Sequence, residues 1–196
     1  MSNTSRPISN VILYDETGTE VGDNSNPLVT SIVDTVKNTY SASAIFGAAA
    51  SATDVFTITG SATTTVRITR ISFTGTQTTG ATRDVLIIKR SAANTGGTSA
   101  TPNRVPHDST FPAATATVRN YTANPSGLGA AVGTIRSQKV LLSASTAVTG
   151  EFIIDWGPRN SQAPVLRGTS EVLAVNLNGV TSTGNSLSIS IEWTEE

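Results

Sequence analysis

The chain has 196 residues, which is long enough for one domain with a buried core of its own. Charged residues make up 14% of it, about half the usual share, and 13 basic against 14 acidic residues give a net charge of −1. This balance excludes strong electrostatic attraction to nucleic acid or to an anionic membrane. The absence of cysteine excludes disulfides, thiolate metal sites and a cysteine nucleophile.

The pattern of apolar residues predicts a β protein. Small polar residues and glycine are abundant and aromatic residues reach only 5%, a composition that suits sheets and turns. No window shows the sustained apolar period of a helix, whereas alternation of apolar and polar residues recurs. The first ten residues lack the apolar region of a secretory signal, and no stretch approaches a membrane span. We therefore expect an all-β protein that is made in the cytoplasm and is not exported by that route.

Residues 1–37 are expected to form an N-terminal arm or hairpin that docks on a neighbour. A unit this short rarely folds alone, so it must lie against another surface. Asp15 to Gly18 predicts a hairpin turn, and Asn26 before Pro27 predicts extended backbone. The segment either adds strands to its own body or reaches to a neighbour, and the extended backbone favours the reaching arm. Its candidate partner-binding residues are Val11, Ile12, Leu13, Tyr14, Leu28, Val29 and Ile32.

Residues 38–196 are expected to form an antiparallel β-sandwich or jelly-roll-like body. The last strand is the clearest, because Leu187, Ile189, Ile191 and Trp193 fall on one face and serines on the other. The expected strands lie at 40–46, 53–60, 66–73, 84–90, 113–121, 134–142, 152–156, 172–178 and 186–193.

Two details of these strands carry structural information. Val66 and Ile68 share one parity while Ile71 and Phe73 share the other, so a β-bulge near Thr69 or Arg70 would return both pairs to one face. The segment 84–90 has apolar residues at both parities, which is typical of a central strand covered on both sides.

Two long polar segments, 91–112 and 122–134, are expected to be exposed loops. The first contains a Gly-Gly pair and several prolines. Loops of this length inside a compact domain are usually functional or disordered. We therefore expect them to offer surface to partners, with Arg104 and His107 as candidate partner-binding residues.

The candidate motifs for catalysis, calcium binding and dinucleotide binding all lack the required spacing or context. His107, Asp108 and Ser109 are consecutive, whereas a catalytic triad needs members that converge from separate elements. The oxygen-rich segment 22–27 lacks the ligand spacing of a calcium loop. The glycines of 127–133 lack the spacing and the βαβ context of a dinucleotide site. We expect no catalytic residue, no metal and no cofactor.

Paired carboxylates and aromatic residues need a separate assessment. A glycoside hydrolase needs two acids in a cleft, and the only candidates are Asp155, Glu171 and Glu192. The alternation around Asp155 indicates a solvated sheet face. Trp156 and Trp193 continue apolar faces and are interpreted as core anchors, whereas Tyr40 and Tyr121 are expected to be exposed at strand ends or interfaces.

Four stretches resemble small virion structural proteins of tailed bacteriophages. They are "VILYDETGTEVGDNSNPLVTS", the run from "LIIKRSAANTGG" to "GLGAAVGTIRS", "VLRGTSEVLAVNLNG" and "ISIEWTEE". The similarity spans most of the chain but contains no sharp functional motif. Proteins of this kind include head decoration (cement) proteins and head fibres, often trimers.

The resemblance implies a structural virion component on the outer surface of the head. Its partners would be the major capsid protein and further copies of itself, most simply a homotrimer, and no nucleic acid or membrane. The alternative is a head-fibre or tail-associated module that binds a host glycan or surface protein. The resemblance transfers no catalytic residue, and we expect the protein not to be an enzyme.

Overall fold

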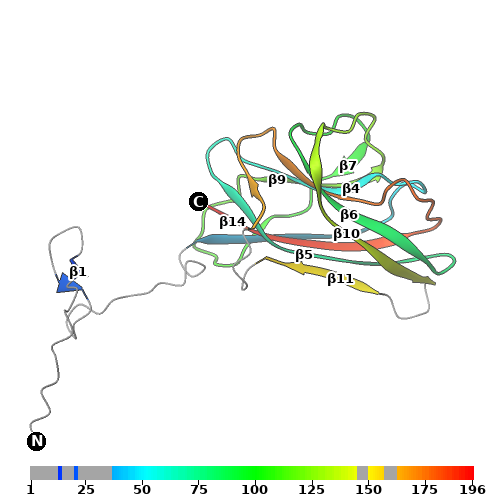
Figure 1. The fold of residues 1–196 in the computed structure, drawn as a ribbon, viewed down its shortest axis with the longest axis horizontal. Coiled ribbons are helices and arrows are strands. Elements are labelled where there is room, and N and C mark those ends of the chain that lie inside the picture. The colour runs from blue at the N-terminus through cyan, green and yellow to red at the C-terminus, as the bar shows by residue number, and fades with distance from the viewer. Residues whose placement is uncertain (1–12, 15–19, 22–36, 145–149, 157–162) are drawn as a thin grey trace, which may run out of the picture. The chain divides into compact units, whose positions relative to one another are not determined.

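The structure, a computed structural model, describes residues 13–14, 20–21, 37–144, 150–156 and 163–196 (Figure 1). The chain divides into two compact units, Met1–Val36 and Lys37–Glu196. In the smaller unit, β1 (Leu13–Tyr14) pairs antiparallel with β2 (Glu20–Val21). The expected turn, the Asn-Pro segment and the side chains of the candidate arm residues lie outside the described residues.

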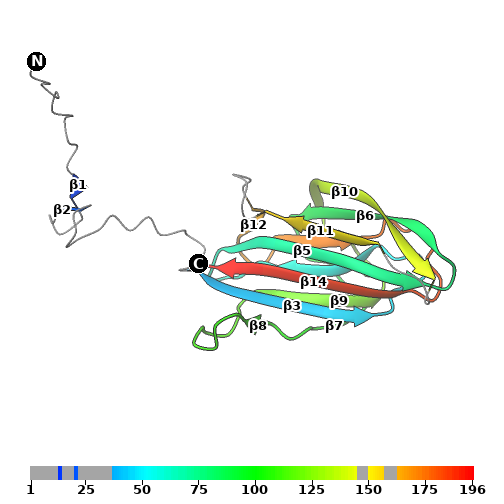
Figure 2. The same cartoon turned by 90° about the horizontal axis from the view of Figure 1, so that it is seen from below.

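Twelve strands of the larger unit form one hydrogen-bonded sheet that curls into two layers (Figures 1 and 2). The first layer contains β3 (Asn38–Phe46), β5 (Val66–Gln77), β8 (Val105–Pro106), β11 (Glu151–Asp155), β12 (Val165–Leu166) and β14 (Ser186–Glu195). The second layer contains β4 (Asp54–Thr59), β6 (Ala81–Arg90), β7 (Thr98–Ala100), β9 (Thr117–Ala123), β10 (Ala131–Ala144) and β13 (Val172–Asn176).

The strand order shows how the layers are joined. The first layer runs β8-β3-β14-β5, with β11 and β12 also paired to β5, and the second runs β7-β9-β4-β13-β6-β10. The strand β10 pairs antiparallel with β6, and its last residues, Ser143 and Ala144, pair in parallel with β5. The predicted all-β sandwich is confirmed. The finer jelly-roll description stays a prediction.

The core lies between the layers and follows the predicted alternation. Leu187, Ile189, Ile191 and Trp193 of β14 are all buried in it. The bulge in β5 is confirmed, because Glu192 pairs with Arg70 and the next residue, Trp193, pairs with Ile68. Thr69 is therefore the extra residue that brings the two apolar pairs of β5 to the same face.

The segment predicted as a central strand also has the expected place. β6 lies between β13 and β10 in the second layer, with Val85 and Ile87 in the core. Leu86 and Ile88, on its other face, are half-buried. No helix in the described part of the chain combines the length and the hydropathy needed to cross a membrane.

The packing of β14 predicts a large difference between two isoleucines. Ile189 is fully buried, whereas Ile45 of the neighbouring strand β3 is 79% exposed. We expect Ile189→Ala to lower the free energy of unfolding by about 3 kcal/mol, because it leaves a cavity in the core. Ile45→Ala should cost less than about 1 kcal/mol. Urea unfolding of both variants measures the difference, and equal losses would contradict the described core.

Candidate functional site

The two long loops pair with each other at the end of the second layer. The Thr95 N–H donates to the Gly127 carbonyl at 2.9 Å, and the Gly127 N–H donates back to Thr95 at 3.2 Å. The Ser91 N–H donates to the Ala130 carbonyl at 2.9 Å. Most of the loop residues are exposed, as predicted. The loops are nevertheless tied together by backbone hydrogen bonds.

A buried ion pair fastens both loops to the sheet. Arg90 at the end of β6 donates to both carboxylate oxygens of Asp54 in β4, from Nε at 2.8 Å and from Nη2 at 2.7 Å. Asp54 is fully buried and Arg90 is 4% exposed. Asn94 and Asn176 donate to the same carboxylate at 2.7 and 2.6 Å. Every group of this cluster is thus satisfied, which burial of charge requires.

The same cluster extends into the second loop. Arg90 donates from Nη1 to the Gly129 carbonyl at 2.8 Å, and the Gly129 N–H donates to Asn94 Oδ1 at 2.9 Å. A Cβ at Gly129 would collide with the Ala92 carbonyl, so glycine is required for this close approach. Both loops therefore take their position from one carboxylate.

The loops bury a second, smaller set of side chains on the outer face of the second layer. Val172 and Ala174 of β13 and Tyr121 of β9 are buried but lie outside the main core cluster. The predicted exposure of Tyr121 is wrong, since only 5% of it is accessible. The alternation of β9 did not reveal that loop residues would cover this face.

The predicted exposure of Tyr40 is also wrong. Tyr40 is 1% exposed, its ring stacks on Trp193 at 5.8 Å, and its hydroxyl donates to the Pro112 carbonyl at 3.0 Å. The cause is the first loop, whose end folds back over β3. Trp193 is a core anchor as predicted, and Trp156 packs against the core while only partly buried.

The end of the first loop is held by another buried carboxylate. Glu195 of β14 accepts hydrogen bonds from the Thr115 N–H at 2.9 Å and the Ala116 N–H at 2.9 Å. The indole N–H of Trp193 donates to the same carboxylate at 2.9 Å. The first loop is therefore attached to both layers, through Asp54 at its start and through Glu195 at its end.

Two candidate partner-binding residues, Arg104 and His107, lie in the first loop. Arg104 is exposed, and its Nη1 donates to the carbonyls of Ala114 and Ala116 at 3.0 and 2.7 Å. His107 has an exposed side chain, while its backbone N–H donates to the Thr39 carbonyl at 2.8 Å. The structure thus assigns Arg104 a part in shaping the loop, and the partner-binding role of both residues stays a prediction.

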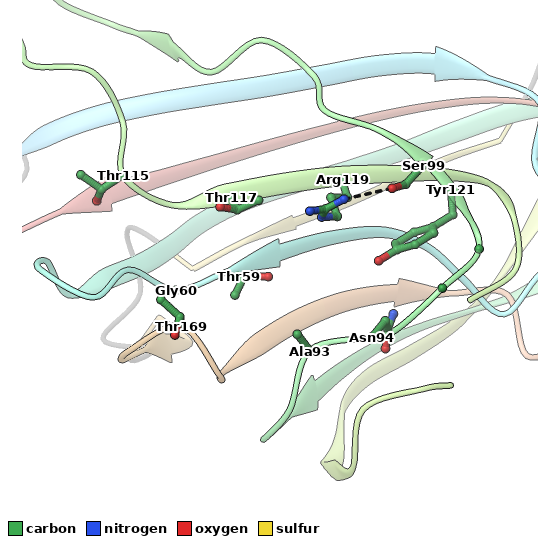
Figure 3. A pocket seen from close by; sticks show the side chains of 12 residues that line it. Thr59, Gly60, Ala93, Asn94, Ser99, Thr115, Thr117, Arg119, Tyr121 and Thr169 are labelled. Atoms are coloured by element: carbon green, nitrogen blue, oxygen red, sulfur yellow. Dashed lines mark hydrogen bonds between the residues drawn. The ribbon is translucent and has the colours of Figure 1, made fainter. Parts of the chain in front are cut away.

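A polar groove lies on the outer face of the second layer, between β4, β9 and the first loop (Figure 3). Its volume is about 520 Å³, within the range of small-molecule sites. Thr59 and Thr117 lie directly opposite each other in adjacent strands, and Arg119 and Tyr121 follow Thr117 on the same face of β9. Arg119 is the one charged residue of the lining. We call this feature the polar groove.

Hydrogen bonds to neighbouring residues position Arg119 and Asn94 in the polar groove. Arg119 donates from Nη1 to Ser99 Oγ at 3.2 Å, and Ser99 is the strand partner of Tyr121. Asn94, which also lines the groove, has both polar atoms engaged by Asp54 and Gly129. Asn94 is therefore held in place, whereas Arg119 keeps further N–H groups that can bind a ligand in the groove.

Among the described residues, no His, Cys, Asp or Glu lines the polar groove. No three His, Cys, Asp or Glu side chains gather there closely enough to hold a metal ion. Asp108 accepts hydrogen bonds from the backbone N–H and the hydroxyl of Thr110 at 2.8 and 2.7 Å, so its carboxylate is engaged within its own turn. Asp155 is exposed on β11, as predicted, and Glu171 is engaged by Lys89 at 3.3 Å. The acids considered for glycoside hydrolysis do not line the polar groove.

A second surface feature is the strand β10 at the end of the second layer. Its residues 131–139 are all exposed, although a strand of a sandwich normally buries one face. Over this stretch β10 pairs with β6 alone among the described strands, so its other edge is open. Exposed apolar side chains lie on it at Val132 and Ile135. We call residues 131–139 the β10 edge.

The comparisons with known proteins do not identify a relative. No family model, no curated protein and no solved structure matches the chain. The two surface features therefore have to be interpreted from their own chemistry.

Reasoning from the sequence did not single out the residues of the ion-pair cluster or of the polar groove. A usable signal existed for both. Asp54 and Arg90 are charges at the ends of otherwise apolar strands, and Arg119 alternates with Val118 in a strand that borders a long loop. The sequence does not show that β13 pairs with both β4 and β6, which brings Asp54 of β4 to Arg90 of β6.

The ion-pair cluster predicts a steep cost for a nearly isosteric change. Asp54→Asn removes the charge that faces Arg90 and leaves a buried guanidinium uncompensated, so we expect a loss of about 3 kcal/mol in the free energy of unfolding. The control is Asp84→Asn in the ion pair with the exposed Lys139, which should cost less than about 1 kcal/mol. Urea unfolding measures both, and an Asp54 variant no weaker than the control would refute the anchoring role.

The Glu195 carboxylate predicts a pH dependence of stability. Burial by itself would raise the pKa of Glu195, but hydrogen bonds from Thr115, Ala116 and Trp193 outweigh it, so the pKa lies below its ordinary value of 4.5. A lowered pKa adds stability that is present above the unfolded-state pKa and is lost as the pH falls through the folded-state pKa. Stability should therefore decline below about pH 4.5.

Several other carboxyls also have lowered pKa values, among them Asp84, Asp108 and Glu196. The contribution of Glu195 is therefore isolated by comparing the native protein with Glu195→Gln. We expect the variant to be less stable at about pH 7 and the gap to narrow at about pH 3.5, below the ordinary pKa of 4.5, because the native protein loses the contribution of Glu195 as the pH falls toward its lowered folded-state pKa. Urea unfolding at both pH values measures the gap. A gap that does not change with pH would exclude a charged Glu195 as the anchor.

Proposed function

We propose that this protein acts by adhesion, as a structural virion protein that decorates the head of a tailed phage as an oligomer and stabilises it. The observation that supports this proposal most is the β10 edge, nine consecutive exposed residues with an open hydrogen-bonding side. Open edge strands pair readily with another chain unless they are blocked. The resemblance of the sequence to virion proteins supplies the proposed location.

Charge separates the two units in a way that favours contact between copies. Residues 1–36 contain one arginine and five acidic residues, a net charge of −4. The remaining chain has twelve basic and nine acidic residues, a net charge of +3. Arg136 and Lys139 lie on the β10 edge itself. An acidic segment of one copy would thus find a basic, partly apolar edge on another.

In this proposal the smaller unit is the arm that reaches a neighbouring subunit or the major capsid protein. If the protein binds the assembled shell and not its separate subunits, binding stabilises the shell by mass action, with no chemical step. An interface of this kind needs about 1,200 Å² or more of total buried area. A homotrimer is the proposed oligomer because the resemblance implies it, and an arm that passes head to tail to the next copy is compatible with a closed ring.

The second candidate function is a head-fibre or tail-associated module that holds a host glycan. The polar groove favours it, since such sites are concave and lined by a few well-placed polar groups. The two functions use separate surfaces, because the groove lies at β9 and β4 and the β10 edge lies at the other end of the same layer.

The decoration role predicts the behaviour of two variants. Deleting residues 1–36 should leave a folded β body, since the core formed by the described residues lies within the larger unit. That body should be monomeric and should no longer sediment with phage heads. Replacing both Val132 and Ile135 by Lys should have the same effect on association, with little change in stability because both side chains are exposed.

The control is Ile45→Lys, which introduces one lysine, where the double variant introduces two, at an exposed apolar position of the other layer. Mass in solution and co-sedimentation with heads are measured for all four proteins. The control should still assemble and bind. A truncated protein that continues to decorate heads would overturn the proposed role of the arm.

A further inference from the structure

We propose that the polar groove binds an acidic saccharide, with Arg119 holding the carboxylate of the sugar. This inference rests on the second candidate function and gives its ligand a chemical class. It does not depend on the decoration role. The steps below concern the charge of the groove, its hydroxyl groups and an unused buried phenol.

The charge of the polar groove selects an anion. Among the residues that the structure describes, its lining contains one arginine and no acidic residue. Arg119 is exposed and uses only Nη1, for Ser99, so the rest of the guanidinium faces solvent in the groove (Figure 3). A guanidinium presents a planar pair of donors that matches a carboxylate. A phosphate group would carry more charge than this single cation balances.

The hydroxyl groups of the polar groove select a ligand rich in hydrogen-bonding groups. Thr59 and Thr117 face each other across adjacent strands, and Thr115 and Thr169 add further hydroxyls. Side chains on one face of a strand are about 7 Å apart, so the row from Thr117 to Tyr121 is about 14 Å long. This length accommodates more than one sugar ring. A peptide would instead be expected at a sheet edge, where main-chain groups are free.

Tyr121 adds a hydroxyl that is available for a hydrogen bond in the polar groove. Only 5% of Tyr121 is exposed, and its hydroxyl points into the polar groove (Figure 3). Among the described residues this hydroxyl has no hydrogen-bond partner, and it is not sealed from solvent. The ring is buried while the hydroxyl stays accessible from the groove, where it can take a hydrogen-bond partner. We assign the ligand's ring hydroxyls as that partner.

The buried ring of Tyr121 also explains why a charge is needed. Sugars without charge are commonly held by stacking on an open aromatic face, but Tyr121 exposes too little of its ring and no other aromatic residue lines the groove. Affinity must therefore come from hydrogen bonds and from Arg119. Charge-assisted hydrogen bonds are the stronger kind. We expect acidic saccharides to bind and neutral ones of the same length to bind at least about tenfold more weakly.

The test is calorimetric titration of the full chain with oligogalacturonate, a hyaluronan fragment and oligosialate. A neutral maltooligosaccharide and inorganic phosphate are the comparison ligands. Arg119→Gln should weaken binding of the acidic saccharide about tenfold or more, and Tyr121→Phe, which keeps the ring, about fivefold. Arg70→Gln, at an exposed arginine of β5 in the other layer, is the matched control and should leave binding unchanged. Equal thermal midpoints show that the variants fold.

Binding of any one of the three acidic saccharides with loss in Arg119→Gln supports the proposal. Failure of all three to bind, binding that is the same in Arg119→Gln, or binding of phosphate alone would overturn it. Co-sedimentation with phage heads is measured on the same proteins. Arg119→Gln should still bind heads, so a failure of the saccharide site is distinguishable from a failure of the decoration role.

Discussion

The buried carboxylate of Asp54 holds the two long loops in position, and the surface that these loops form depends on it. Arg90, Asn94 and Asn176 all donate to it, and the same arginine and asparagine hold Gly129 of the second loop. The loops are polar and rich in glycine and could not hold their shape by apolar packing. A fully satisfied ionic cluster replaces that packing. It draws the loops over the second layer, and this buries a set of side chains that the main core does not contain.

Two surfaces result from this arrangement, and they differ in kind. The polar groove lies where the first loop crosses β4 and β9, and its floor is fixed by the residues that satisfy Asp54. The β10 edge lies at the far end of the same layer, beyond β6, and offers backbone groups and apolar side chains. The first surface suits a small hydrophilic ligand and the second suits another polypeptide. A protein that joins a shell at one surface and holds a sugar at the other would need both.

The sequence predicts the strands of this protein well and its surface poorly. Alternation alone locates the buried face of β14, and the change of parity between Ile68 and Ile71 locates the bulge at Thr69. These features depend on neighbours in the chain. Tyr40 and Tyr121 were expected to be exposed and are buried, Tyr40 beneath the distant Pro112 and Tyr121 beside β7 and the first loop. The partner of Asp54 was equally hidden, since β13 lies between β4 and β6 in space and follows both in the chain.

Hydrogen exchange of the loop amides tests the central claim that one carboxylate orders both loops. The N–H groups of Thr95, Gly127 and Gly129 are all hydrogen-bonded within the paired loops. We predict that at neutral pH they exchange at least about a hundredfold more slowly than in an unstructured peptide, as amides of ordered structure do. Exchange at the unprotected rate at all three positions would show that the loops are not held, and would contradict the account.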